Sequence, residues 1–413
     1  MFWASKVEFV EKDNKIVLAN RENGQWIRIS KEVYNILDAI IRNGKDISQI
    51  KKAFVDEDDY AYVNKLFNYL KETEVIIDGE EIKSYHNKIA SIQLTNRCNL
   101  HCTHCCVSAG ENLCNEFDTK TIKAILDKVV EWNPRNIMLS GGEPLIRNDF
   151  FEILSYLRNQ YLGKIIVSTN ALLIDEENVK YLYRDCDGME ISIDGVDEET
   201  CALVRGKGVF KKVCDKIELL HRNGIENINL SMVFSDKNEH LMERFNKLNE
   251  KLGTNPICRT FTAIGRGEKN RAIFTEKDEE DIYIPSDYME DDYTNAFGVS
   301  MCTAGKREIF ITCEGNIQPC PTYTEKQYTI GNIMEIDDLK SLLNADNTEL
   351  VSKAVLNSYP YNIEICRNCE VKLFCWTCPG ELLSIKTKAA FCKRCDILKP
   401  ILMKRVWESN INM

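Results

Sequence analysis

The chain has 413 residues, which is too long for a single compact core, so we expect two or three domains. Its 44% of apolar residues suffice for buried cores, and its formal net charge of −11 argues against binding to nucleic acid or to an anionic membrane surface. The first residues run directly into charged side chains, and no later stretch is long and apolar enough to cross a bilayer. We therefore expect a cytoplasmic protein with no membrane partner.

Cysteine is unusually frequent in this chain, with 18 residues. In a secreted chain so many cysteines would indicate disulfides, whereas in a reducing compartment they indicate metal or redox chemistry. The number alone does not distinguish these uses. Their spacing along the chain does.

Residues 1–86 have the pattern of a separate small domain. Alternating apolar residues predict short strands at 7–10, 16–19 and 26–29, with a tight turn at Asn23-Gly24 between the last two. Ser30 is a predicted helix N-cap, and Asn43-Gly44 ends that helix. The pattern is completed by further helices and a final strand, at 47–55, 58–71 and 75–77. Strands and helices in this order resemble a winged helix-turn-helix domain.

From residue 88 to about 265 the pattern changes to a repeated series of strand, loop and helix. The predicted strands lie at 91–94, 137–139, 165–167, 190–193, 229–233 and 259–262. Such a series is typical of an α/β fold with a parallel sheet, here a partial (β/α)6 barrel. In folds of this kind the chemistry gathers at the carboxyl ends of the strands.

The remainder of the chain divides at about residue 300. Residues 266–300 are acidic and irregular, which predicts a solvated connector or lid. After Met301 the chain is rich in loops and holds nine of the 18 cysteines. We therefore expect three domains, at 1–86, 87–300 and 301–400.

A compact group of cysteines, Cys98, Cys102 and Cys105, directly follows the first strand of the repeated region. Thiolates at this spacing can hold one face of a cubane iron–sulfur cluster and leave the fourth iron without a protein ligand. Such an open iron can be chelated by the amino and carboxylate groups of a methionine. The alternative is a zinc site in which His101 or His104 is the fourth ligand.

Small polar residues follow the next strands. The second strand ends in Gly141-Gly142-Glu143-Pro144, whose glycines allow close backbone approach and whose carboxylate can accept from an ammonium group. The residues that could bind ribose hydroxyls and a purine edge end the third and fourth strands: Ser168, Asn170, Ser192 and Asp194. Arg205 either pairs with a carboxylate of the ligand or is an ordinary surface charge.

In this order, the motifs over residues 88–265 resemble the radical SAM superfamily. The resemblance implies a [4Fe–4S] cluster on the three cysteines and S-adenosylmethionine (SAM) on its open iron. Reductive cleavage of SAM would give methionine and a 5′-deoxyadenosyl radical, which removes a hydrogen atom from the substrate. His104 departs from the pattern, because the family often has a larger aromatic residue before the last cysteine, and stacking on the adenine would be weaker.

The C-terminal cysteines resemble the SPASM extension of radical SAM enzymes, which carries two auxiliary [4Fe–4S] clusters. The resemblance implies that the first cluster is bound by Cys302, Cys320 and Cys378. It implies that the ligands of the second are Cys366, Cys369 and Cys375, completed by Cys392 or Cys395. Both clusters could then accept the electron that is released as product forms.

Two details differ from the SPASM pattern. Only two residues separate Cys375 from Cys378, where the family usually has three. Cys313 is additional, and it either closes the first auxiliary cluster or is a buried thiol. The alternative for the whole region is a set of zinc ribbons made of paired Cys-x2-Cys units.

The N-terminal domain bears on the class of substrate. A winged helix is typical of DNA binding, but residues 1–90 have a net charge of −2 and therefore lack the basic footprint that binds phosphates. The domain instead resembles the peptide-recognition element of enzymes that mature ribosomally made peptides. That resemblance implies capture of a leader peptide as an added strand on a hairpin edge within residues 7–29.

Together, the three regions resemble maturases that cross-link ribosomally synthesised precursor peptides. The resemblance implies a thioether from a cysteine sulfur to a carbon, a precursor peptide bound through its leader, and an external electron donor (flavodoxin or ferredoxin). Carbon–carbon or carbon–oxygen cross-linking of a similar peptide stays open, as does maturation of a folded protein such as a sulfatase. A regulatory iron–sulfur protein that binds DNA is a further alternative, although the acidic first domain argues against it. No general base can be assigned from the sequence.

Overall fold

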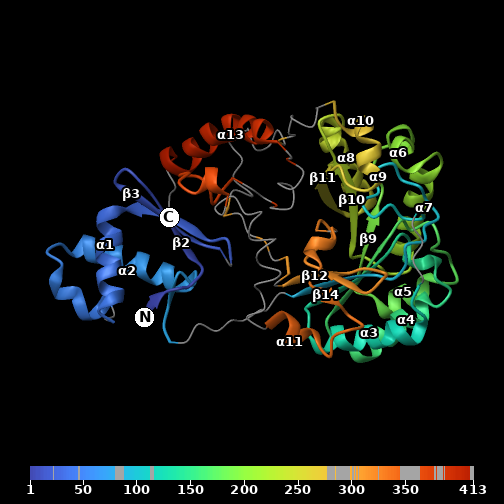
Figure 1. Cartoon of the computed structure of the whole chain (residues 1–413), viewed down its shortest axis with the longest axis horizontal. Helices are drawn as coiled ribbons and strands as arrows, with labels where there is room; N and C mark the ends of the chain where they lie inside the picture. Colours follow the sequence, from blue (N-terminus) through green and yellow to red (C-terminus); the bar gives the residue numbers. More distant parts are fainter. Residues whose placement is uncertain are drawn as a thin grey trace. The chain divides into compact units, whose positions relative to one another are not determined.

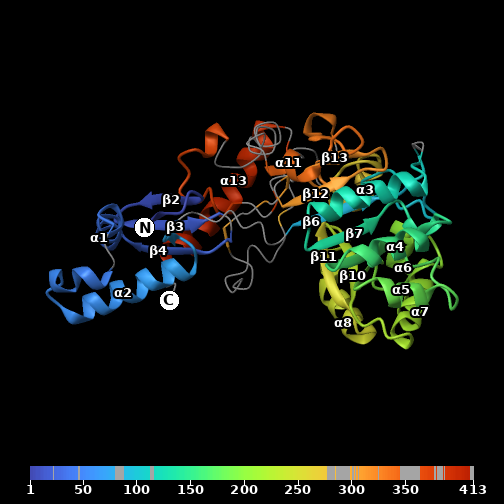
Figure 2. The same cartoon turned by 90° about the horizontal axis from the view of Figure 1, so that it is seen from below.

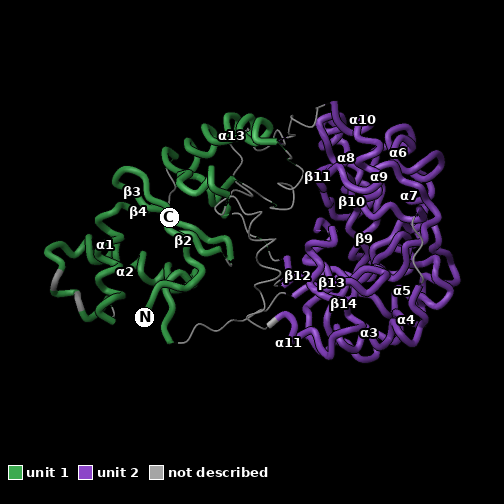
Figure 3. Tube along the Cα trace, viewed as in Figure 1, with its two compact units in different colours: residues 1–84, 286–302, 356–413 green, residues 85–285, 303–355 purple. Residues whose placement is uncertain are grey.

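The computed structural model describes residues 1–21, 23–44, 47–79, 88–111, 116–276, 307–323, 325–344, 363–375 and 387–409, together with residues 284, 298, 299, 302, 304, 305, 378 and 385. The chain forms two compact units (Figure 3). The first contains Met1–Ser84, Ser286–Cys302 and Leu356–Met413, and the second contains Tyr85–Pro285 and Thr303–Val355. The expected third domain, 301–400, thus contributes to both units.

The first unit begins with the elements expected from the sequence and with one short strand, β1, that was not predicted (Figure 1). Its strands are β1 (Phe2–Trp3), β2 (Val7–Lys12), β3 (Lys15–Asn20), β4 (Trp26–Ser30) and β5 (Ile76–Ile77), and its helices are α1 (Lys31–Arg42), the 3-10 helix η1 (Ile47–Ala53) and α2 (Glu57–Glu72). Strands β2, β3 and β4 form an antiparallel sheet in that order, and β1 pairs with β5. The Oγ of Ser30 accepts a 3.2 Å hydrogen bond from the N–H of Val33, which confirms Ser30 as the N-cap of α1.

One face of the β2–β3–β4 sheet packs on the helices. In the register of β3 and β4, Leu18 lies opposite Ile27 and Ile16 lies opposite Ile29, so these four side chains share a face. They join the buried residues of α1 and α2 in one apolar cluster. Burial of this cluster holds the sheet against both helices.

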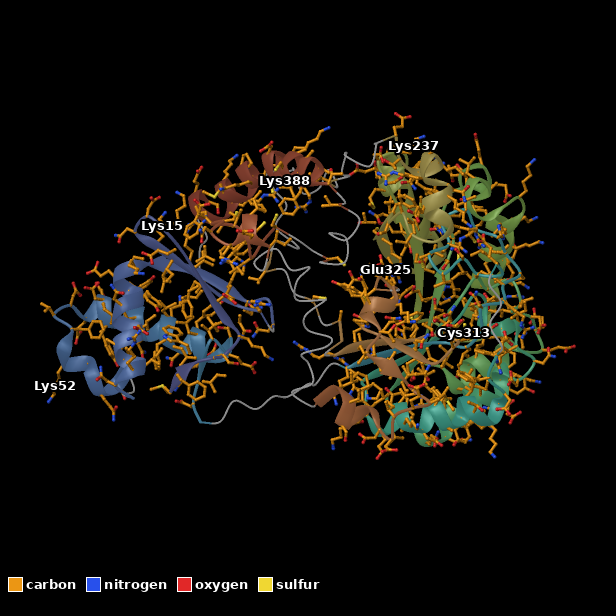
Figure 4. All side chains as sticks on the ribbon, in the orientation of Figure 1. Lys15, Lys52, Lys237, Cys313, Glu325 and Lys388 are labelled. Carbon is orange, nitrogen blue, oxygen red and sulfur yellow. The ribbon has the colours of Figure 1, made fainter. Side chains whose placement is uncertain are left out.

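The opposite face of the same sheet is covered by the C-terminal end of the chain (Figures 1 and 2). On that face Arg28 donates hydrogen bonds to the carbonyl oxygens of Val406 and Ser409. Lys15, which is labelled in Figure 4, donates to the carbonyl oxygen of Trp407 at 3.4 Å. The covering segment contains the 3-10 helix η7 (Glu364–Cys366), α13 (Lys388–Met403) and the π-helix η9 (Lys404–Glu408).

An aromatic contact joins the sheet to the same C-terminal segment. The ring centroids of Trp26 and Phe374 are 4.7 Å apart and the rings meet edge to face at 68°. Between these contacts, the side chains of Val17 and Ala19 are fully buried on the same face. Strand β3 therefore lies between two apolar layers, one from α1 and α2 and one from the C-terminal segment.

The second unit is built on six parallel strands, whose order in the sheet is their order in the chain. They are β6 (Ile89–Gln93), β7 (Asn136–Ser140), β8 (Lys164–Thr169), β9 (Gly188–Ser192), β10 (Ile228–Phe234) and β11 (Asn255–Thr260). The helices that alternate with them and share their apolar core are α3 (Thr119–Glu131), α4 (Phe150–Gln160), α5 (Val179–Asp185), α6 (Glu198–Arg205), α7 (Val209–Arg222) and α8 (Met242–Leu252). The predicted series of strands and helices is confirmed. None of the described helices is long and apolar enough to cross a membrane.

The last parallel strand begins earlier than the sequence pattern predicted. We expected it at 259–262, whereas β11 starts at Asn255 and includes Pro256. Proline has no N–H to donate and is therefore unfavourable inside a sheet. Strand β11 lies at the edge of the sheet, beside β10 only, which is where a proline is tolerated.

The sheet continues on the other side of β6 with strands from the C-terminal region. Strand β12 (Glu308–Ile311) pairs with β6 in parallel, and β13 (Asn316–Gln318) and β14 (Gly331–Asn332) follow in antiparallel. The helix α11 (Leu339–Asn344) completes this part. Strand β6, which leads to the first cysteine group, is therefore an interior strand of a nine-stranded mixed sheet.

The expected connector at 266–300 begins as ordered structure. Residues Arg266–Lys269 form α9 and Arg271–Phe274 form α10, and the side chains of Arg266 and Phe274 are buried. The ring of Phe274 stacks on Phe261 with centroids 4.5 Å apart. The prediction of a solvated connector is wrong for 266–274, because the acidic residues on which it rested lie further along, mostly outside the described residues.

Candidate iron–sulfur and cofactor site

The loop after β6 carries the first cysteine group in a form suited to thiolates. The Sγ of Cys98 accepts from the N–H of Leu100 at 3.4 Å, and the Sγ of Cys105 accepts from the N–H of Ala109 at 3.3 Å. Burial, together with the neighbouring Cys102 and Cys105, raises the pKa of Cys98 to about 11. Thiols in this environment need a metal to deprotonate them, and backbone N–H groups stabilise the sulfur charge once it forms.

The donor set fits a cubane cluster better than a single ion. Among the described residues, no three His, Cys, Asp or Glu side chains converge closely enough to surround one metal ion. Thiolates on a cubane each bind a different iron atom and therefore stand farther apart than the ligands of one ion. Cys102 and Cys105 each lie close enough to Cys98 to raise its pKa, and all three cysteines are carried by one loop.

The glycine pair after β7 packs directly on this loop. The N–H of Gly142 donates to the carbonyl oxygen of Thr95 at 2.8 Å, and the N–H of Glu143 donates to that of Arg97 at 2.9 Å. A Cβ on residue 142 would lie 2.4 Å from the carbonyl oxygen of Arg97, so only glycine fits there. The close backbone approach that the sequence predicted is made to the cysteine loop itself.

Glu143 links the ends of β7 and β8. Its buried carboxylate accepts hydrogen bonds from the Oγ1 of Thr169 at 2.7 Å and from the N–H groups of Asn170 and Leu145 at 2.8 and 3.1 Å. Burial raises its pKa, and these three donors oppose the rise. A carboxylate has about four acceptor sites, so one is left for the ammonium group that the sequence predicted as its partner.

Asn170 brings the end of β8 to the cysteine loop. Its Nδ2 donates to the Oδ1 of Asn99 at 2.7 Å and lies 4.0 Å from the Sγ of Cys98. Its Oδ1 accepts from the N–H of Leu172 at 3.0 Å, which fixes the orientation of the amide. Ser168 and Ser192 are half-buried at the ends of β8 and β9.

Asp194 forms a buried ionic group with two other predicted residues. Its carboxylate accepts from the Nε of Arg205 at 2.8 Å and lies 2.7 Å from the Nε2 of His104. Burial alone would raise the pKa of Asp194, but Arg205 and His104 outweigh it and hold that pKa well below the ordinary value. Arg205 is thus paired within the protein, and its remaining N–H groups are those that could meet a ligand carboxylate.

Sequence reasoning missed two buried arginines that support the loop. Arg147 donates to the carbonyl oxygens of Leu94 and Phe117 at 3.2 and 3.1 Å and to the carboxylate of Asp149. Arg266 donates to the carbonyl oxygen of Cys102. The available signals were positional: Arg147 follows the predicted Gly-Gly-Glu-Pro motif closely, and Arg266 stands between two glycines.

The structure gathers one group of cysteines in the C-terminal segment of the first unit. Burial, together with Cys395, Cys375 and Cys369, raises the pKa of Cys366 to about 12. Burial also raises the pKa of Cys395, and Cys375, Cys369 and Cys392 act in the same direction. The buried Arg394 donates to the Sγ of Cys375 at 3.2 Å and to its carbonyl oxygen at 2.9 Å.

The other predicted ligands are divided between the units. Cys302 and Cys378 belong to the first unit, and Cys313 and Cys320 belong to the second. Cys313, labelled in Figure 4, is buried in the turn between β12 and β13, where its N–H donates to the Oε1 of Gln93 at 3.3 Å. The sharing of one cluster by Cys302, Cys320 and Cys378 stays a prediction.

Family profiles match both cysteine-rich regions. Residues 92–248 match the radical SAM superfamily, and residues 302–370 match the SPASM iron–sulfur cluster-binding domain. The chain therefore has a radical SAM fold followed by a SPASM domain, with the iron–sulfur clusters and SAM binding that these domains imply.

Curated relatives are similar over more than half of the chain. The mycofactocin maturase MftC of Mycolicibacterium smegmatis is 27% identical over 261 residues, which are 59% of this chain and 66% of the relative. The antilisterial bacteriocin subtilosin biosynthesis protein AlbA of Bacillus subtilis is 26% identical over 306 residues, 70% of this chain and 66% of the relative. The chain thus spans about two thirds of the length of these relatives.

Solved structures share the fold. SuiB of Streptococcus suis bound to S-adenosylmethionine superposes with a TM-score of 0.54 at 16% identity and covers 94% of this chain and 98% of that one. The protein anSMEcpe with bound AdoMet and a peptide superposes with a TM-score of 0.53 at 19% identity, over 77% of this chain and 98% of that one. At these identities the similarity establishes the fold.

Replacing Gly142 with alanine is expected to disrupt the cysteine loop. The added Cβ would overlap the carbonyl of Arg97 at 2.4 Å and the Cβ of Ala109 at 2.9 Å, and backbone must move to relieve it. We expect anaerobically reconstituted G142A to bind SAM about tenfold more weakly than wild type, as measured by equilibrium dialysis.

The matched control is Gly331→Ala, whose Cβ would meet only ordinary contacts at 3.7 and 4.0 Å. It should bind SAM as wild type does. Equal affinity in G142A and wild type would contradict the importance of this close approach.

Proposed function

We propose that this protein is a radical SAM maturase that installs cross-links in a ribosomally synthesised precursor peptide. The bond that we propose is a thioether between a cysteine sulfur and a carbon of another residue. The SAM-binding cluster would supply the 5′-deoxyadenosyl radical that removes a hydrogen atom from that carbon. The protein's own residues would hold the cluster loop, bind the peptide and carry the clusters that take up the surplus electron.

The proposal is carried by the first cysteine loop, held by the ends of β7, β8 and β9 as a SAM-binding cluster requires. The substrate class is supported by the relatives, two of which are described as a maturase and a bacteriocin biosynthesis protein. It is also supported by the fold: SuiB bound to its precursor peptide SuiA superposes over 94% of this chain with a TM-score of 0.54.

The N-terminal sheet, which we interpret as a winged-helix peptide-recognition domain, offers backbone for an added strand. Strands β2 and β4 are its two outer strands. The N–H of Asn20 donates to the carbonyl oxygen of Gln25 at 2.8 Å. Because successive N–H groups along a strand point alternately toward and away from its neighbour, this bond shows which residues of each strand point outward. By that alternation, the N–H groups that point away from β3 include those of Phe9 and Glu11 on β2 and of Arg28 on β4.

Hydrogen exchange on the intact protein would identify the edge that binds the leader. If the leader adds a strand, the outward N–H groups of one edge should become protected when a synthetic leader peptide is added, with Phe9 and Glu11 reporting on β2 and Arg28 on β4. A scrambled leader is the control. Unchanged exchange at both edges, with the leader shown to be bound, would contradict strand addition.

The second auxiliary cluster, in our proposal, is bound by Cys366, Cys369 and Cys375 with Cys395 as the fourth ligand. Cys395 is favoured over Cys392 because it affects the pKa of Cys366, as Cys369 and Cys375 also do. The N–H donors of Arg394 at the Sγ of Cys375 would favour the reduced cluster, which helps it to accept an electron from the product radical.

Replacing the two cysteines of the last pair tests this assignment. Cys395→Ser should lose the iron and sulfide of one cubane after anaerobic reconstitution, because it removes a ligand, whereas Cys392→Ser should keep the wild-type content. Both variants carry the same change on α13, so each controls for the other. Loss of iron in C392S with full content in C395S would reverse the assignment.

The peptide activity is tested with the precursor itself. We expect the purified protein, with SAM and a reductant, to remove two hydrogen atoms per link from a cysteine-rich precursor peptide encoded beside this gene. Mass spectrometry of the peptide would measure this loss. Loss of alkylatable thiols would identify thioethers. Cys98→Ala should abolish both 5′-deoxyadenosine formation and cross-linking, whereas Cys186→Ala, which changes a half-buried cysteine outside the clusters, should retain both.

Other outcomes decide against parts of the proposal. Hydrogen loss with every thiol still alkylatable would replace the thioether with a carbon–carbon or carbon–oxygen link. An unmodified precursor beside active SAM cleavage would contradict the assignment of that peptide as substrate.

A further inference from the structure

The segment 265–270, between β11 and α10, lies directly against the loop that carries Cys102 and Cys105. Gly265 has a φ of +57°, and a Cβ at this position would lie 2.4 Å from the carbonyl oxygen of Cys106 and 2.6 Å from that of Cys105. Only glycine permits both the backbone conformation and this approach. The segment therefore makes backbone contact with the cysteine loop.

Arg266 is the main link between the two. Its side chain is buried, and its Nε donates to the carbonyl oxygen of Cys102 at 3.0 Å. Its Nη1 donates to the carbonyl oxygen of Ala109 at 2.8 Å and to the carboxylate of Glu111 at 3.1 Å. One planar guanidinium thus bridges the middle and the end of the loop, which a lysine cannot do.

Two neighbouring groups extend the contact. The backbone N–H of Arg266 donates to the carbonyl oxygen of Cys105 at 3.0 Å, and the Nδ2 of Asn270 donates to that of Thr103 at 3.0 Å. Arg266 therefore donates to the carbonyls of two predicted cluster ligands, to Cys102 through its side chain and to Cys105 through its backbone. Such contacts hold the backbone of the loop in place, and they thereby fix the positions of the cysteine thiols that it carries.

The charge around Arg266 differs from that around Arg205. Glu111 accepts from both Arg266 and Lys269, at 3.1 Å each, so this group of three carries a net charge of +1. Hydrogen bonds from the two cations lower the pKa of Glu111 and keep it ionised. Arg205, by contrast, is paired with the buried carboxylate of Asp194.

A buried positive charge beside an iron–sulfur cluster favours its reduced form, because reduction adds a negative charge. We propose that Arg266 is a positioning residue of the SAM-binding cluster, which fixes the loop of Cys102 and Cys105 and raises the reduction potential of the cluster. Of the proposed function, this inference assumes only that the loop holds a SAM-binding cluster. It is independent of the peptide and of the bond formed.

Three variants of the full-length protein test the inference. Arg266→Gln removes the buried charge, Lys269→Gln removes the same charge at an exposed position of the same helix, and Glu111→Gln removes the counter-charge. Each is reconstituted anaerobically, and its iron content and midpoint potential are measured, the latter by following the paramagnetic signal that changes when SAM is added. The rate of 5′-deoxyadenosine formation with a chemical reductant is the second readout.

We expect the midpoint potential to fall in R266Q, to rise in E111Q, and to change least in K269Q because solvent screens that charge. We expect 5′-deoxyadenosine to form about tenfold more slowly in R266Q. Selective loss of the SAM-binding cluster from R266Q, with the auxiliary iron retained, would support the positioning role.

Full iron content with an unchanged potential and rate in R266Q would overturn the inference. If R266Q does not fold, the variants Arg266→Lys and E111Q test the inference in its place. R266K keeps the charge but loses the bridge between carbonyls, so it should form 5′-deoxyadenosine slowly at a nearly unchanged potential. Wild-type behaviour of both variants would equally overturn the inference. A peptide that stays unmodified while these potentials shift would count against the proposed substrate and not against Arg266.

Discussion

The loop from Leu94 to Ala109 contains no helix or strand, so its buried backbone groups must find partners elsewhere in the chain. Those partners come from several directions. The N–H groups of Gly142 and Glu143, after β7, donate to the start of the loop, and the N–H of Thr103 donates to the carbonyl oxygen of Val204 in α6 at 2.9 Å. His104 is held by Asp194 after β9. The three thiols therefore take their positions from the whole parallel sheet and not from the cysteine motif alone.

Local patterns predicted most of the elements and the chemistry-bearing residues, but not how these residues pair. Alternation and capping residues located the strands and helices, because both are set by near neighbours in the chain. The pairing of Arg205 with Asp194 depends on the geometry of separate elements, which spacing does not encode. The start of β11 and the burial of Arg266 were missed for the same reason, since the edge position of β11 and the burial of α9 are properties of the assembled sheet.

Arginine is used at both groups of thiols, in different ways. Arg205 is neutralised by a buried carboxylate and joins α6 to the end of β9. Arg394 lies beside Cys375 and donates directly to its sulfur. The guanidinium stays charged in each place and offers several donors in a fixed plane, so it can stabilise backbone and sulfur together. An arginine thus lies beside each group of cysteines, Arg205 on α6 of the second unit and Arg394 on the C-terminal helix α13.

The burial of β3 on both faces limits how the N-terminal part of the chain can be exchanged between related proteins. The N-terminal sheet shares one of its faces with residues more than 300 positions away, through Trp26, Phe374 and the carbonyl of Val406. Dividing the chain after the N-terminal domain would expose two apolar surfaces to water, one on each fragment. Chimeras that exchange the N-terminal sheet should therefore transfer the two ends of the chain as a pair. Substitutions at the two ends should likewise vary together among descendants of this chain.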